Sequence, residues 1–241
     1  MTTIDKLSFK DLPYLVSIEI PNTVVRVGEF AFLQCYKLQT VIFSASVNHI
    51  ADGMFSECRL LKSATFGDNV ISFGEDTFSY CENLEFFVLP PMALHLSAGM
   101  FRDCTRLTEV INLDQVTSIG PGALAYCRGL KGTFTIPLGV TIIEANTFLN
   151  CSGLTGLILH EGVTSIGRGA FRNCKSLEFI RMETRGVTFI GYQAFWGCTR
   201  LRNVIVPHNV TQFCYRDASE MTTTVWSVNE NNILEKRGFN Y

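Results

Sequence analysis

Nine cysteines give this 241-residue chain its most obvious capacity for chemistry, because thiolates bind zinc and pair into disulfides. Zinc needs four ligands that converge on one point, and the chain contains no C-x-x-C pair to supply them. A regular column of cysteines places parallel thiols in a line, which suits neither zinc nor disulfides. We therefore predict free, buried thiols that fill space and hydrogen-bond weakly to neighbouring backbone. Eight cysteines recur in this way every 23 or 24 residues, at Cys35, Cys58, Cys81, Cys104, Cys127, Cys151, Cys174 and Cys198.

Histidines and carboxylates are the other residues that could catalyse a reaction or hold a metal. None of the histidines has a cysteine, serine or carboxylate at a spacing that converges on it, so we expect solvated loop residues. Phosphate-binding glycine loops, G-x-S-x-G and H-E-x-x-H are all missing from the sequence. We predict no catalytic residues, no cofactor, no metal and no enzyme activity. The histidines are His49, His95, His160 and His208, and the ninth cysteine, Cys214, is either exposed or buried near the C-terminus.

The cysteine spacing is one column of a longer repeat. Phenylalanine stands three residues before each of these cysteines, with leucine once at Leu124, and leucine stands three residues after every one. An apolar residue, most often isoleucine, stands eight residues before. Ile4, Phe9, Leu12 and Leu15 fit the same columns with leucine in place of cysteine, which makes nine turns. A period of this length predicts stacked repeats in which equivalent side chains form a continuous core.

Each turn carries two signals for extended backbone. The pattern Leu-x-x-φ-x-φ, where φ is apolar, alternates with period two and is often followed by proline, as at Pro21, Pro90 and Pro207, which predicts a strand and its end. A second short extended stretch follows, for example at residues 163–166. We expect the glycine after it to supply a positive backbone φ angle, and the A-F-x-x-C segment to make one tight helical turn.

The repeat resembles a known family. The unit I-G-x-x-A-F-x-x-C-x-x-L-x-x-φ-x-φ-P, nearly complete at residues 166–182 and 190–207, is similar to the BspA-like class of leucine-rich repeats. That resemblance implies a right-handed solenoid with a concave parallel sheet, often in cell-surface or adhesion proteins of microbes, with a protein-binding role. We therefore predict a leucine-rich-repeat solenoid that is mainly β, with about nine strands in the concave sheet, short second strands and helical turns.

We divide the chain into two parts. Residues 1–213 form the solenoid of about nine repeats, and residues 214–241, where the columns are lost, form a C-terminal cap. Ser227 and Glu230 fit a capping box, Lys236 and Arg237 suit a helix C-terminus, and Gly238 follows as a stop. The cap is therefore predicted to be partly helical, after a short strand or irregular piece at residues 222–226.

The outward side chains of the predicted concave sheet are the candidate binding surface. In each strand one residue between two inward positions faces outward. These residues are Glu19, Ile42, Thr65, Val88, Ile111, Thr135, Ile158, Arg181 and Ile205, with Phe86, Phe179 and Arg202 beside them. β-Branched residues also favour strands for their own sake. The outward residues are therefore explained by strand propensity alone, or they also form an apolar ridge between Glu19 and the two arginines that receives an extended protein segment. The two interpretations are compatible.

Composition bounds the function further. The net charge of −2 gives no reason to expect nucleic acid as a partner, and no apolar run is long enough to insert into a membrane. We predict a non-catalytic protein-binding or scaffold module with a protein or peptide ligand. The alternative is a self-associating structural or cell-surface adhesion protein that pairs through the N-terminal edge at residues 15–20. The sequence as it stands predicts a cytoplasmic location, and a fragment of a longer chain would be extracellular or at the cell surface.

Overall fold

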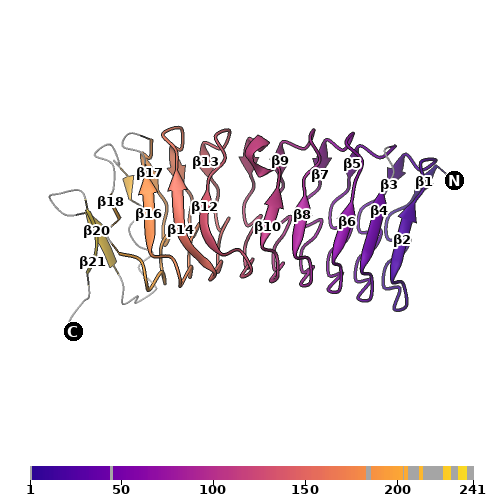
Figure 1. Ribbon diagram of the computed structural model, residues 1–241, viewed down its shortest axis with the longest axis horizontal. Helices are drawn as coiled ribbons and strands as arrows, with labels where there is room; N and C mark the ends of the chain where they lie inside the picture. Colours follow the sequence, from indigo (N-terminus) through magenta and orange to yellow (C-terminus); the bar gives the residue numbers. More distant parts are fainter. Residues whose placement is uncertain are drawn as a thin grey trace.

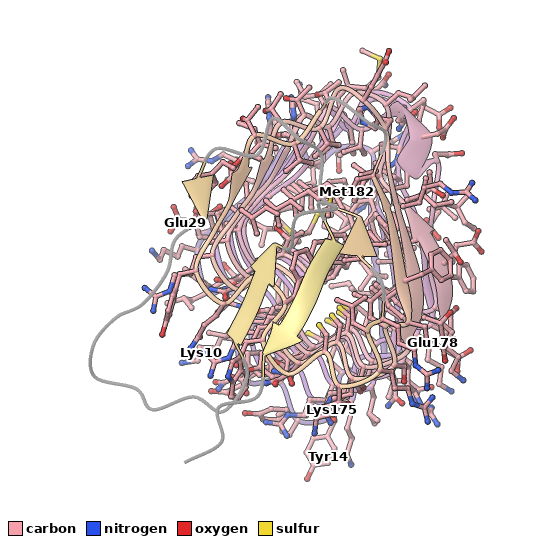
Figure 2. All side chains as sticks on the ribbon, turned by 90° about the vertical axis from the view of Figure 1, so that its left-hand side faces the viewer. Lys10, Tyr14, Glu29, Lys175, Glu178 and Met182 are labelled. Atoms are coloured by element: carbon pink, nitrogen blue, oxygen red, sulfur yellow. The ribbon has the colours of Figure 1, made fainter. Side chains whose placement is uncertain are left out.

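The chain winds into an elongated stack of turns, seen from the side in Figure 1 and along the stack in Figure 2. The computed structural model describes residues 2–43, 46–182, 186–202, 204–205, 212–213, 225–228 and 233–237, with side chains described up to residue 202. Within these residues no helix has the length and hydropathy of a membrane span. The one helix there is a single 3₁₀ turn, η1 at Leu113–Gln115. The architecture is the predicted leucine-rich-repeat solenoid, built from two rows of strands.

One strand of each turn builds the main sheet, which contains nine strands among the described residues, as expected; the first eight pair in parallel, whereas the ninth pairs in antiparallel. Apolar residues point inward at every second position, as the alternating burial of Thr40–Phe43 shows. Parallel backbone pairing joins these strands into groups of three, two and three, with the last strand outside them. The main strands are β2 Ser17–Ile20, β4 Thr40–Phe43, β6 Ser63–Thr65, β8 Phe86–Val88, β10 Glu109–Ile111, β12 Gly132–Thr135, β14 Leu154–Leu159, β16 Phe179–Met182 and β18 Val204–Ile205.

The short strands form a second row on the other side of the core. Each has two residues, one exposed or half-buried and one buried where its side chain is described, and pairs in parallel with its neighbour in the stack. They are β1 Thr3–Ile4, β3 Arg26–Val27, β5 His49–Ile50, β7 Ser72–Phe73, β9 His95–Leu96, β11 Ser118–Ile119, β13 Ile142–Ile143, β15 Ser165–Ile166, β17 Phe189–Ile190 and β19 Gln212–Phe213.

The segment between the short strand and the cysteine differs from the prediction. It consists of successive tight turns rather than a helix, and each contains two left-handed residues, for example Gly99 with φ +62° and Asp103 with φ +58°. The repeat glycines, such as Gly120, are not these residues, so the prediction of positive φ there was wrong. A Cβ at Gly120 would lie 2.7 Å from the backbone nitrogen of Ala98. Glycine is needed because the backbones of neighbouring turns approach closely.

The Phe and Cys columns form the core. The Phe32, Phe55 and Phe78 rings stack in parallel with centroids 5.4 and 5.6 Å apart, and a similar stack joins Phe148, Phe171 and Phe195. Leu124 stands between the two stacks, as the sequence requires. Burial of each ring stabilises the fold by about 1.5–3 kcal/mol, so the column holds the turns together.

The spacing of 24 rather than 23 residues between Cys127 and Cys151 coincides with a bulge in the main sheet. The pairing of β12 with β14 shifts register between Gly132 and Thr133, and Gly132 takes a φ of +74°. A single residue is therefore absorbed locally and the columns continue on either side. The other 24-residue spacing, from Cys174 to Cys198, spans residues 183–185, which lie outside the described residues.

The structure of the C-terminal segment differs from the predicted helical cap. The predicted short extended piece at residues 222–226 overlaps β20 at Val225–Val228, but the residues predicted to be helical after it form the end of β20 and β21 at Ile233–Arg237, which pair as antiparallel strands. β21 also pairs with β18, where Val204 lies opposite Leu234. The local capping signals at Ser227 are outweighed because the last main strand offers unpaired backbone groups, and β-forming residues such as Trp226 satisfy a ladder better than a helix. The boundary at residue 213 stays a prediction.

Candidate functional site

The outward residues of the main sheet lie opposite one another within each of its three groups of paired strands. Glu19 pairs with Ile42, and Ile42 pairs with Thr65. Val88 pairs with Ile111 in the next group of strands. Thr135 pairs with Ile158, which pairs with Arg181. The residues that the sequence analysis selected therefore form a row along the sheet, which we call the sheet stripe.

Large apolar side chains are exposed in the sheet stripe. The exposed fractions are 50% for Ile42, 48% for Val88 and 36% for Ile111, whereas Ile158 is half-buried. The inward neighbours Val41 and Phe87 are almost completely buried. The burial of these residues agrees with the predicted alternation of inward and outward positions.

Two aromatic rings lie beside the sheet stripe. Phe86 is 49% exposed and pairs with Glu109, while Phe179 is 43% exposed and pairs with Gly156. A Cβ on Gly156 would coincide with the Phe179 ring, so the glycine lets this ring lie flat on the sheet surface. Both rings are exposed, as expected for the outward face, whereas no sequence pattern indicated that Gly156 makes room for Phe179.

Charged residues stand toward the two ends of the sheet stripe. Glu19 is exposed on β2, and Arg181 and Arg202 are exposed at the opposite end. Arg202 joins the stack through its backbone nitrogen, which donates to the Glu178 carbonyl at 3.1 Å. The side chain of Ile205 lies outside the described residues, so the stripe is described from Glu19 to Arg181.

The cysteine column occupies the core as predicted and makes the expected weak hydrogen bonds. Each thiol donates to a carbonyl of the preceding turn, as Cys104 does to Phe78 at 3.2 Å. Burial raises the pKa of Cys81 well above its usual range, and raises that of Cys198 to about 12. A thiol that stays protonated is a poor nucleophile and a poor metal ligand, so this column stabilises the fold. Cys214 lies outside the described residues.

Histidines in the described residues serve local structure. Nδ1 of His49 lies 2.7 Å from Oγ of Ser72, and Nδ1 of His95 lies 2.8 Å from Oγ of Ser118. His160 is half-buried rather than solvated, and its ring bonds to backbone groups of two loops. The described residues contain no group of three or more His, Cys, Asp or Glu that could hold a metal. His208 is outside them.

A second concave feature escaped the sequence analysis. It is a cavity of about 400 Å³ on the face formed by the tight turns, where Arg102, Asp103 and Asn146 surround small residues. Lys10 and Glu29 occupy, in other turns, the positions of Arg102 and Pro121. In the view along the stack in Figure 2, they lie on the opposite side of the solenoid from Glu178, which directly precedes β16. The sequence signal that could have indicated this cavity is that two consecutive turns have glycine at the same repeat position, at Gly99 and Gly122.

The stack of turns, with one main strand, one short strand and one segment of tight turns in each, defines a leucine-rich-repeat solenoid. A family profile described as "BspA type Leucine rich repeat region (6 copies)" matches residues 2–131 and 130–236. The chain belongs to this BspA-type leucine-rich-repeat family. The family consists of repeat proteins, which agrees with the sequence resemblance.

Solved structures support the same fold. A leucine-rich cell surface protein from Faecalibacterium prausnitzii is 25% identical, with a TM-score of 0.52, over 87% of this chain and 78% of that chain. A leucine-rich repeat protein from T. pallidum is 22% identical, with a TM-score of 0.54, over 83% and 82% of the two chains. A third, from Bacteroides ovatus, is 23% identical, with a TM-score of 0.50, over 86% and 70%. A search of curated protein sequences finds no match.

Proposed function

We propose that the chain is a non-catalytic protein-binding module whose sheet stripe holds an extended segment of a partner protein. The observation that carries this proposal is the exposure of Ile42, Val88 and Ile111 at the outward position of their main strands. Phe86 and Phe179 enlarge this apolar surface. Contiguous exposed apolar side chains on a regular sheet are typical of protein interaction surfaces.

The charges toward the stripe's ends favour one orientation of the partner. Glu19 attracts a basic group at the N-terminal end, and Arg181 and Arg202 attract acidic groups at the other. A partner segment with its basic and acidic residues at opposite ends therefore fits the surface in one direction. The apolar centre supplies affinity, while the charges supply direction and speed of association.

A paired set of variants tests this proposal. Immobilised wild-type protein captures partners from a lysate, and a purified captured protein is then titrated by calorimetry. Ile42→Glu with Val88→Glu should weaken binding at least about tenfold, because each buries a charge in the apolar interface. Val25→Glu with Ile71→Glu is the matched control, since both are exposed apolar residues beside the short strands. Equal loss in both variants, or retention in the first, would place the binding site elsewhere.

Self-association is the second candidate, and the first turn favours it. Leu7, Leu12, Tyr14 and Val16 are exposed there, and within the described residues β2 pairs only with β4. An apolar end with an open strand edge is a surface for a second copy. Light scattering should then show dimers at rising concentration, with Leu12→Asp and Val16→Asp restoring the monomer. A strict monomer in the wild type would contradict it.

Adhesion at a cell surface is the form of the binding function that the comparisons favour. The Faecalibacterium prausnitzii protein is a cell surface protein, and it covers most of this chain. Antibody labelling of intact cells that express the full gene tests this location. Labelling only after the cells are broken open would favour the cytoplasmic alternative.

A further inference from the structure

The cavity on the turn face is independent of the sheet stripe, and its origin is visible in the repeat. In each turn a residue with a positive φ angle occupies the position that Gly99 and Gly122 hold in theirs, and its side chain commonly lies over the next turn. Thus Phe30 lies over Gly53, and Asn146 lies over Gly169. Gly99 and Gly122 follow one another, so no such side chain covers Gly122, where the nearest group is Arg102 Nη2 at 3.3 Å from a Cβ position. The missing side chains leave the cavity.

The lining combines apolar residues, most of them small, with polar and aromatic side chains. The volume of about 400 Å³ is within the range of small-molecule sites. The lining residues are Tyr80, Arg102, Asp103, Pro121, Gly122, Ala125, Tyr126, Ala145, Asn146 and Leu149. Tyr80, Asp103 and Tyr126 occupy one position of three successive turns, all left-handed, so a carboxylate stands between two phenol rings.

The polar groups of this lining have hydrogen-bonding capacity to spare. Among the described residues, no side-chain hydrogen bond involves Tyr80, Arg102, Asp103, Tyr126 or Asn146. Arg102 Nε is buried without a hydrogen-bond partner and lies 3.9 Å from an oxygen of Asp76, beyond hydrogen-bond distance. Burial raises the pKa of the Asp103 carboxyl, although Arg128 and Arg102 oppose the shift. The site therefore offers donors, acceptors and aromatic faces to a ligand.

Charge balance argues against a ligand that carries a net charge. The lining contains one cation, Arg102, and one carboxylate, Asp103, so a simple anion meets a repelling carboxylate and a simple cation meets a repelling guanidinium. A neutral molecule with several hydroxyls suits both groups, because a hydroxyl donates one hydrogen bond and accepts others. Tyrosine rings add an apolar face for C–H groups.

We propose that this cavity binds one neutral saccharide residue. Arg102 and Asn146 donate hydrogen bonds to its hydroxyl oxygens, and Asp103 accepts from its hydroxyl groups. Tyr80 or Tyr126 packs against the C–H face of the sugar ring. The solenoid then carries two binding faces, one for a protein segment on the main sheet and one for a glycan on the turns.

Saturation-transfer NMR on the full chain tests the proposal with a panel of free sugars. The probes are D-glucose, D-galactose, D-mannose, L-fucose and N-acetylglucosamine at millimolar concentration, with sodium acetate and sodium phosphate as anion probes. Saturation of the tyrosine ring protons should transfer to at least one sugar. Arg102→Ala should weaken that sugar's binding about tenfold or more, because it removes hydrogen bonds from a charged group. Tyr126→Asn should do the same, because asparagine tolerates the left-handed backbone but lacks the ring.

Arg172→Ala is the matched control. Arg172 occupies the position of Arg102 three turns further along and stacks on Trp196 at 4.6 Å, outside the cavity. Its variant should bind the sugar as the wild type does. If Arg102→Ala fails to fold, Asp103→Asn should show the loss instead. No transfer to any sugar, equal binding by the cavity variants, or binding of acetate or phosphate alone would overturn the proposal.

Discussion

Single residues link neighbouring turns in two ways. The phenylalanine rings stack at 5.1 to 5.7 Å, and each cysteine thiol donates to a carbonyl of the turn before, at the Phe position of its column. The sequence predicts both columns because their spacing is regular and their side chains are apolar. It cannot predict which backbone carbonyl accepts from the thiol, because that depends on the offset between turns.

Substitution of one cysteine tests the fit of the thiol. Cys104→Ser should lower the free energy of unfolding by about 1–3 kcal/mol, because it buries a more polar group whose shorter bond places the hydroxyl farther from the Phe78 carbonyl. Cys104→Ala should cost less, since it leaves only a small cavity. Urea denaturation measures both values. A serine variant more stable than the alanine variant would contradict this prediction, because it would show that the buried hydroxyl is accommodated at this site.

The buried thiols also predict sensitivity to alkaline pH. Unfolded thiols ionise near pH 8.5, whereas burial raises the pKa of Cys198 to about 12 in the fold. Below about pH 8.5 both states are protonated and the stabilisation is complete. Above it the unfolded state loses protons that the folded state keeps, so the free energy of unfolding falls by about 1.4 kcal/mol per pH unit per thiol. Urea midpoints between pH 8 and 10 should fall steeply, and less so in Cys104→Ala; a constant midpoint would contradict this.

At the scale of elements, the repeat glycines show how the sequence can indicate the right residue for the wrong reason. The glycine column marks a bend, and the usual reason for glycine in a bend is a positive φ angle. At Gly28, Gly120 and Gly167 the cause is the backbone of the preceding turn, 2.5 to 2.7 Å from a Cβ position. That contact joins residues a full turn apart, so no local pattern reveals it.

Because the backbone of the preceding turn lies so close, we expect Gly120 not to tolerate even one added methyl group. Gly120→Ala should lower the free energy of unfolding by about 1–3 kcal/mol, because the backbones at Gly120 and Ala98 must separate. Ala51→Gly, at the same position of another turn, should cost only about 0.5–1 kcal/mol. Thermal unfolding of both variants measures the contrast. Equal losses would mean that the column responds to glycine content rather than to the close approach.

The last strands show the limit of local signals. The capping box at Ser227 is a short-range pattern, while the pairing of β21 with β18 depends on an edge some thirty residues earlier. Truncation after Val206 should lower the melting temperature and the solubility, because it removes β20 and β21 from the end of the stack. Calorimetry and sedimentation of the shortened chain test this. An unchanged melting temperature would make these strands dispensable.

At the scale of the whole molecule, the sequence predicts the stack and the sheet stripe because both follow from periodicity. The turn-face cavity is a departure from periodicity: Gly99 and Gly122 interrupt a position that carries a side chain in the turns on either side. Whether such a gap is filled depends on how far Arg102 reaches across the neighbouring turn. The row of outward residues was therefore predictable from the sequence, whereas the cavity was not, because it depends on contacts between turns.

Contacts between adjacent turns predict how far the destabilisation caused by one substitution extends along the stack. Phe101 stacks on Phe78 at 5.7 Å and also contacts Phe87, so Phe101→Ala should cost about 3–5 kcal/mol. Because each turn touches only its neighbours, hydrogen exchange should accelerate most in the turns of Cys81, Cys104 and Cys127 and least near Cys35 and Cys174. Mass spectrometry of peptic fragments resolves these turns. Uniform acceleration along the chain would mean that the solenoid unfolds as one cooperative unit.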